Sequence, residues 1–144
     1  AIIIRTSWVY SEYGNNFVKT MLRLGRERDQ LNVIFDQVGT PTYAHDLAIN
    51  ILNIIESSHN IQRDKVSLYH FSNEGVCSWY DFAKAIFELS NTQCSILPIE
   101  TKDYPTAAKR PFYSVLNKAK IKQTYQLNIP YWKDSLQACL NKLQ

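Results

Sequence analysis

Tyr80 and Lys84 stand one helical turn apart, a spacing that suits an acid–base pair. A lysine ammonium at this distance lowers the pKa of the phenol, so that the tyrosine can exchange a proton with a carbonyl or an alcohol. However, Tyr80 follows Trp79 in the first turn of an expected amphipathic helix, and no nucleotide-binding motif precedes the pair. We therefore interpret the match as ordinary helix packing and expect no catalytic residue in this chain.

Other catalytic patterns are absent from the sequence. It has no GxGxxG or GxxxxGK motif, and four glycines leave little room for a loop that holds phosphate. No serine lies in a nucleophile-elbow sequence. The histidines lack metal-ligand spacing, so no metal site is expected at His45, His59 or His70. The cysteines have no CxxC spacing and are expected to be unpaired thiols in a reducing cytoplasm: Cys77, Cys94 and Cys139.

Residues near the N-terminus are the first candidates for ligand binding. Trp8 and Tyr10 end the first expected strand, where open α/β sheets bind ligands, so these rings either face a sugar or pack in the core. Asn15, Asn16 and Phe17 open a helix, whose N–H groups and positive dipole end suit a diphosphate. The alternative for the two asparagines is simple helix capping.

Two later segments add polar candidates. Gln37 and Thr42 belong to a polar turn that precedes a helix. Arg110 precedes Pro111 in an irregular stretch that begins near Thr101, and long irregular stretches often carry binding residues. A guanidinium binds phosphate with two donors at once, although a lone arginine is more often a surface residue.

Alternating strand and helix patterns must position these residues. We expect strands at residues 1–10, 31–35, 67–71 and 94–97. We expect a first helix of about three turns, capped by Asn15 or Asn16. Further helices are expected from the turn at 39–42 to about Glu56, from Ser78 to about Leu89, as a short helix after Asn117, and from Pro130 to near Leu143. The second helix has an expected apolar face of Leu47, Ile51, Leu52, Ile54 and Ile55. The pattern predicts an α/β fold with a small sheet and several helices.

Composition excludes several classes of protein. The 144 residues are 45% hydrophobic and 20% charged, which is typical of one globular domain. The formal net charge of +3 does not favour a nucleic-acid partner, and no apolar run approaches the roughly 20 residues that span a bilayer. The run Ala1–Ile4 has no initiator Met, and its three consecutive β-branched isoleucines are typical of a strand buried on both faces. We therefore expect the chain to begin partway through a larger fold.

Five motifs in series resemble the C-terminal half of the dTDP-4-dehydrorhamnose reductases, which are extended short-chain dehydrogenases/reductases. They are Arg5–Tyr10, Gly14–Leu22, Asp36–Thr42, Trp79–Ala83 and Arg110–Pro111. The resemblance implies that residues 1–144 form a domain that binds a sugar nucleotide. It also implies that residues 1–10 are a strand of an NAD(P)-binding Rossmann domain, most of which lies outside this chain.

The resemblance further implies a reaction and its partners. In this family NADPH or NADH delivers hydride to the 4-keto carbon of dTDP-4-dehydro-L-rhamnose, giving dTDP-L-rhamnose for bacterial surface polysaccharides. The family's glycine-rich loop and catalytic Tyr-x-x-x-Lys lie upstream of the segment that matches Ala1, so the chain alone is expected to be inactive. Implied substrate contacts fall on Trp8, the Asn15–Asn16 region and Arg110.

The same resemblance leaves the assembly and the exact activity open. Some members form a magnesium-linked dimer through glutamates, but the matching places carry His45 and Lys133, so this metal is not expected, while a homodimer stays possible. Two alternatives remain. One is another nucleotide-sugar epimerase or dehydratase, and the other is a non-catalytic relative such as the regulatory subunit of methionine adenosyltransferase.

Overall fold

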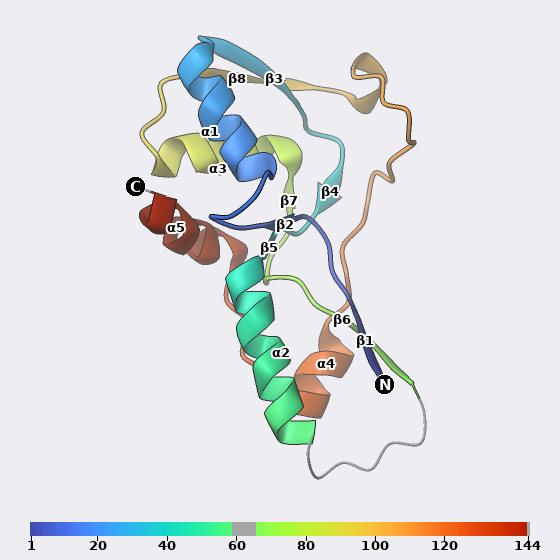
Figure 1. Ribbon diagram of the computed structural model, residues 1–144. Coiled ribbons are helices and arrows are strands. Elements are labelled where there is room, and N and C mark those ends of the chain that lie inside the picture. Colours follow the sequence, from blue (N-terminus) through green and yellow to red (C-terminus); the bar gives the residue numbers. More distant parts are fainter. Residues whose placement is uncertain (59–65, 144) are drawn as a thin grey trace.

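The computed structural model describes residues 1–58 and 66–143, which form an α/β fold, as expected (Figure 1). The strands pair two by two. The pairs are β1 (Ile2–Arg5) with β6 (Ser67–His70), β2 (Val9–Tyr10) with β5 (Thr42–Tyr43), and β3 (Gln30–Ile34) with β8 (Ser95–Ile99), all parallel, and β4 (Val38–Gly39) with β7 (Cys77–Ser78), antiparallel. The pairing is largely between segments far apart in the sequence.

The helices lie around these strand pairs. They are α1 (Phe17–Glu27), α2 (Ala44–Ser58), α3 (Trp79–Leu89), a 3-10 turn η1 (Thr101–Asp103), α4 (Ala119–Tyr125) and α5 (Trp132–Leu143). In Figure 1, α1 and α3 accompany β3 and β8 at one end of the molecule, and α2 and α4 accompany β1 and β6 at the other. The short strands β2, β4, β5 and β7 lie between the two groups.

Two helix starts form as the sequence predicts. The side chain of Asn16 accepts a hydrogen bond of 3.2 Å from the Lys19 N–H, which satisfies one of the donors that a helix N-terminus leaves free. Ser78 and Asp81 form a reciprocal capping box at the start of α3. Each start is therefore fixed by contacts within a few residues of the chain.

The predicted strand at residues 1–10 is wrong as one continuous element. Trp8 has a φ of 48°, in the left-handed region that L residues rarely adopt, so the chain turns between β1 and β2. Ile3 is 50% exposed, so β1 is not buried on both faces in this structure. The predicted turn at residues 39–42 instead ends β4 and begins β5.

The other corrections concern helices. The apolar face predicted for α2 is wrong in part, because Leu52 and Ile55 are exposed while Ile54 and the polar Asn50 are buried. Lys118 is the N-cap of α4, although the Asn117 side chain accepts a 2.9 Å hydrogen bond from the Ala119 N–H. The final helix begins at Trp132, two residues after Pro130.

Two apolar cores correspond to the two groups of elements. The larger one contains Tyr10, Val18, Phe82, Ile86 and Leu136, and joins α1, α3 and α5 to β3. The smaller one is formed by Ile54, Tyr69, Phe71, Ile121, Tyr125 and Ile129. Burial of apolar side chains at roughly 25 cal/mol per Å² is the main force that holds such packing together.

A buried polar network connects the two groups. The Asn73 amide donates to the Asp46 carboxylate at 2.7 Å and to the Ser135 hydroxyl at 2.9 Å, while its carbonyl accepts from the Tyr43 N–H at 2.8 Å. The Ser135 hydroxyl also donates to Asp46 at 2.5 Å. The Asn73 side chain thereby connects β5, α2 and α5, and the buried polar groups at this junction have hydrogen-bond partners.

Two sequence-based expectations concern the chemistry of the chain as a whole. All three cysteines are free and buried, as expected. Within residues 1–58 and 66–143, no helix has both the length and the apolar character needed to cross a membrane. His59 lies outside the described residues.

Candidate functional site

A hollow of about 560 Å³ lies between α1, β3, the start of α3 and the loop that follows β8. Three of the residues predicted from the sequence line it together: Phe17, Gln37 and Arg110. Its apolar part comes from residues of α1 and β3 such as Met21, Leu24, Leu31 and Val33. Segments that are distant in the sequence therefore converge on one cavity.

The loop that carries Arg110 is anchored at its beginning. The Asp36 carboxylate accepts hydrogen bonds from the Thr101 N–H at 3.0 and 3.1 Å and from the Thr101 hydroxyl at 2.6 Å. The Gln37 amide, buried at the edge of the hollow, donates to the same hydroxyl at 3.2 Å. The start of the loop is thus held by two neighbouring side chains.

The end of the same loop is held by the next residue of the chain. The Val38 N–H donates to the Phe112 carbonyl at 2.8 Å, and the Ser114 N–H donates to the Val38 carbonyl at 2.8 Å. Residues 104–111 have no helix or strand and are exposed, with Arg110 near their end. Three consecutive residues, 36–38, therefore fix both ends of the loop that covers one side of the hollow.

The electrostatics of the Asp36 anchor follow from these contacts. Burial alone would raise the pKa of the Asp36 carboxyl, but hydrogen bonds from the Thr101 hydroxyl and N–H outweigh this effect, so the pKa is lowered below 3.8. The carboxylate is consequently charged at neutral pH and remains a good acceptor for both Thr101 donors.

A cluster of three aromatic side chains lies at another side of the hollow. The rings of Trp8 and Trp79 are stacked with centroids 3.7 Å apart and an interplanar angle of 15°. The Phe17 ring lies 4.7 Å from that of Trp79, at 52°. Trp79 and Phe17 line the hollow, whereas Trp8 stacks on Trp79. Trp8 is thus connected to the hollow through Trp79.

The remaining predicted site residues lie apart from this cluster. Tyr10 is 2% exposed and stacks on Tyr43, so its ring belongs to the core, the alternative that the sequence left open. Thr42 is fully buried, and its hydroxyl accepts from the Thr6 hydroxyl at 3.3 Å. Asn15 is exposed, while Asn16 is occupied by capping and by a 2.7 Å hydrogen bond to the Ser11 carbonyl.

The charged groups around the hollow favour an anionic ligand. Arg28 and Arg110 contribute two guanidinium groups and Asp103 a single carboxylate. The side-chain amides of Asn32 and Gln37 add hydrogen-bonding groups beside the apolar surface. An apolar cavity with a few polar groups and an arginine at its rim suits a planar ring joined to a phosphate group.

The buried thiols offer no nucleophile. Burial raises the pKa of Cys77 to about 12 and that of Cys139 to about 11, so both stay protonated at neutral pH. Tyr80 packs against the larger core and is absent from the lining of the hollow. The described residues around this hollow are therefore suited to binding.

Some residues of this site were not predicted as site residues, among them Asp36 and Trp79, which stood only within longer motifs, and Thr101. Asp36 and Thr101 act as a pair across 65 positions, which no local motif could reveal. Trp79 was expected in the first turn of an amphipathic helix, as the neighbour of Tyr80, and was given no role of its own. An aromatic residue at a helix N-terminus was the signal that the sequence offered. The contact with Trp8 could not be predicted, because only the pairing of distant strands brings the two rings together.

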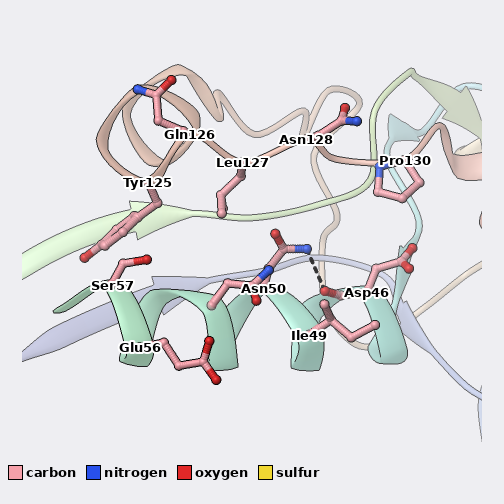
Figure 2. A pocket seen from close by; sticks show the side chains of 11 residues that line it. Asp46, Ile49, Asn50, Glu56, Ser57, Tyr125, Gln126, Leu127, Asn128 and Pro130 are labelled. Carbon is pink, nitrogen blue, oxygen red and sulfur yellow. Dashed lines mark hydrogen bonds between the residues drawn. The ribbon is translucent and has the colours of Figure 1, made fainter. Parts of the chain in front are cut away.

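A second hollow, of about 450 Å³, lies between α2 and residues 125–130 (Figure 2). Figure 2 shows Asn50 donating to the Asp46 carbonyl on one side and Leu127 and Asn128 on the other. This hollow includes none of the residues predicted for the site, and its charged groups are the carboxylates Asp46 and Glu56. Two carboxylates would repel a phosphate, so the hollow beside Arg110 is the better candidate.

The sequence of this chain matches a known family of domains and several curated proteins. A family model described as RmlD substrate binding domain matches residues 1–144. A dTDP-4-dehydrorhamnose reductase of Aggregatibacter actinomycetemcomitans is 46% identical over 142 residues, covering 94% of this chain and 48% of the relative. The chain spans about half the length of the curated relatives it matches.

Solved structures agree with this match. A dTDP-4-dehydrorhamnose reductase from Clostridium acetobutylicum has a TM-score of 0.91 at 42% identity, covering 99% of this chain and 49% of that one. One from Bacillus anthracis in complex with NADP has a TM-score of 0.88 at 40% identity, covering 99% and 48%. A dTDP-glucose 4,6-dehydratase from Bacillus anthracis, at 16% identity and a TM-score of 0.73, covers 97% and 43% and shares the fold alone.

Proposed function

Because this chain belongs to the RmlD substrate binding domain family, we propose that it is the part of a dTDP-4-dehydrorhamnose reductase that binds the nucleotide sugar. The observation that carries the proposal is the meeting of Phe17, Gln37 and Arg110 around one hollow. The hollow receives the nucleotide, and Arg110 holds its diphosphate. Trp8 lies toward the sugar.

Different residues of the hollow contact different parts of the nucleotide. The apolar residues of α1 and β3 bind the flat base through contact area, and the Gln37 and Asn32 amides supply directional hydrogen bonds. Arg110 neutralises the diphosphate with its guanidinium, which forms charge-assisted hydrogen bonds. The anchored loop keeps Arg110 near the hollow, because Asp36 and Val38 hold its two ends.

The whole enzyme would reduce the 4-keto carbon of dTDP-4-dehydro-L-rhamnose to give dTDP-L-rhamnose, with NADPH or NADH supplying the hydride. The residues of this chain do not fit the dinucleotide. It has no glycine-rich phosphate loop, and none of its four glycines lies in a GxGxxG sequence. We assign the dinucleotide site and the proton donor to a further segment, the NAD(P)-binding Rossmann domain, to whose sheet β1 contributes a strand. The complex of a relative with NADP supports NADPH as the donor.

The setting of the enzyme follows from the same proposal. Free, buried thiols suit the reducing cytoplasm as its compartment. The magnesium-linked dimer is not favoured, because His45 and Lys133 stand where glutamates would hold the metal, and Lys133 forms an ion pair with Glu88 at 3.0 Å.

The decisive experiment compares ligands on the full-length enzyme. Calorimetric titration should detect binding of dTDP and dTDP-L-rhamnose, and NADPH should be oxidised when the 4-keto sugar nucleotide is added. The 144-residue chain alone should show no reductase activity, because hydride and proton donors lie outside it. Reduction by the chain alone, or preference of the full enzyme for UDP-sugars in epimerisation, would overturn the assignment. Full-length protein without turnover would favour a non-catalytic binding subunit.

A further inference from the structure

We propose that Trp79 is a positioning residue, which holds Trp8 in the orientation that contacts the sugar of the bound nucleotide sugar. The inference rests on the function proposed above. It concerns how the enzyme distinguishes a nucleotide that carries the sugar from one that does not.

The starting point is the conformation of Trp8. Its φ of 48° lies in the left-handed region, where an L residue is held only by its surroundings. The residue sits between β1, which pairs with β6, and β2, which pairs with β5. Its backbone carbonyl accepts from the Thr42 N–H at 3.1 Å. The main chain of Trp8 is therefore fixed, and the direction of its side chain depends on the neighbours of the ring.

Two neighbours restrict the ring of Trp8. A Cβ added to Gly39 would lie 2.8 Å from Cζ2 of Trp8, so the indole rests directly against the backbone of β4. The Trp79 ring stacks on the same indole at 3.7 Å. Pairing of Gly39 with Cys77 brings β4 and the start of α3 together. The Trp8 indole therefore packs against the backbone of Gly39, which has no side chain, and against the flat ring of Trp79.

Trp79 is itself well fixed. It is the first residue of α3 and lies within the Ser78–Asp81 capping box, directly after the N-cap Ser78. Its ring also contacts Phe17, and both residues line the hollow assigned to the nucleotide. Trp79 therefore touches the nucleotide site with one part and orients Trp8 with another. Removing it should free the Trp8 ring without removing Arg110 or Gln37.

The positioning role of Trp79 can be measured through the contribution that the sugar makes to binding. The ratio of the Kd for dTDP to the Kd for dTDP-L-rhamnose measures how much the sugar adds, and contacts made only to the nucleotide cancel in it. In the full-length enzyme, Trp79→Leu should lower this ratio by roughly two- to ten-fold, the range expected for one aromatic interaction. Trp8→Leu should lower it by a similar factor, and the double variant should add no further loss. Trp79→Phe should retain part of the ratio, because a phenyl ring can still stack.

Trp132 provides the matched control. It is the remaining tryptophan, is 5% exposed, and lies in the larger core away from the hollow. Trp132→Phe should reduce stability and leave the ratio unchanged. Two stacked indoles also give coupled bands in circular dichroism. These bands should disappear in Trp8→Leu and Trp79→Leu and persist in Trp132→Phe.

The outcomes separate the inference from the proposed function. An unchanged ratio in Trp79→Leu, independent losses that add in the double variant, or an equal loss in Trp132→Phe would overturn the positioning role. If Trp79→Leu does not fold, the same test applies to Trp79→Phe, in which full retention of the ratio together with loss of the coupled bands would overturn it. Failure of the unmodified enzyme to bind dTDP and dTDP-L-rhamnose would instead overturn the proposed function.

Discussion

The Asp36 carboxylate receives both the N–H and the hydroxyl of Thr101, 65 positions later in the chain. This contact joins the end of β3 to the first residue of η1, which follows β8. Because β3 and β8 are paired, this contact continues the association of the two segments beyond the strands, as far as the edge of the hollow. The loop with Arg110 starts from this point.

Removing this anchor should weaken nucleotide binding. In the full-length enzyme, Asp36→Ala leaves the partly buried Thr101 donors without their acceptor, and a typical intramolecular hydrogen bond contributes roughly 0.5–1.5 kcal/mol. We expect dTDP affinity to fall several-fold, because Arg110 is held less well, with NADPH affinity unchanged. Calorimetry measures both. Lys102→Ala is the control, because Lys102 pairs with Glu100 on the exposed surface, where ion pairs contribute little. Equal losses in the two variants would contradict the anchor.

The same contact predicts a pH dependence. The folded-state pKa of Asp36 is lowered, so its stabilising contribution is present above the ordinary value of 3.8 and is lost as the pH falls through the lowered pKa. Titration followed by NMR at the Asp36 carboxyl carbon should show a midpoint below 3.8. Thr101→Val removes the hydroxyl donor and should move this midpoint upward. A midpoint unaffected by Thr101→Val would show that the hydroxyl does not control the carboxyl.

Arg110 should help to hold the diphosphate of the bound nucleotide. A charge-assisted hydrogen bond is worth roughly 1.5–3 kcal/mol, so Arg110→Ala should weaken dTDP binding by about ten-fold or more. Arg110→Lys should recover only part, since it keeps the charge and loses the two-donor geometry. Lys109→Ala, the neighbouring exposed residue, serves as control. Unchanged dTDP affinity in Arg110→Ala would return Arg110 to the class of surface residues.

Tyr80 should be dispensable for turnover despite its spacing from Lys84. Its ring packs against the larger core, and it does not line the hollow. Tyr80→Phe keeps that packing, so kcat of the full-length enzyme should stay within a few-fold of the unmodified value. Loss of an acid–base group would cost roughly 10² to 10⁴-fold. A decrease of that size, in a variant of unchanged thermal stability, would relocate the active site.

Local signals predicted parts of this fold well. Asn16 and Ser78 start helices because their side chains satisfy N–H groups three residues later, and this chemistry is visible in the sequence. The bounds of β3, β6 and β8 lie within two residues of those expected. Arg110 and Gln37 were predicted as polar residues in or beside irregular segments, and both line the same hollow, while their role in binding stays a prediction.

Other features depend on contacts that the sequence does not display. Alternation along a strand would place Trp8 and Tyr10 on one face, but the left-handed Trp8 breaks the strand and Tyr10 enters the core. In α2, apolar residues occur nearly all round the helix, so periodicity alone could not assign Asn50 to the buried side. The Asn50 amide donates to the Asp46 carbonyl, so one of its polar groups is satisfied at this buried position.

The attachment of the Arg110 loop to residues 36–38 has a consequence for how such enzymes diversify. Because both ends of the loop meet the same short stretch of backbone, its interior can be lengthened, shortened or exchanged without moving the opposite wall of the hollow. Each doubling of the length of a closed loop costs only about 0.6 kcal/mol of conformational entropy. Insertions, deletions or replacements between the two anchored ends should therefore cost little stability and leave the scaffold of the hollow unchanged.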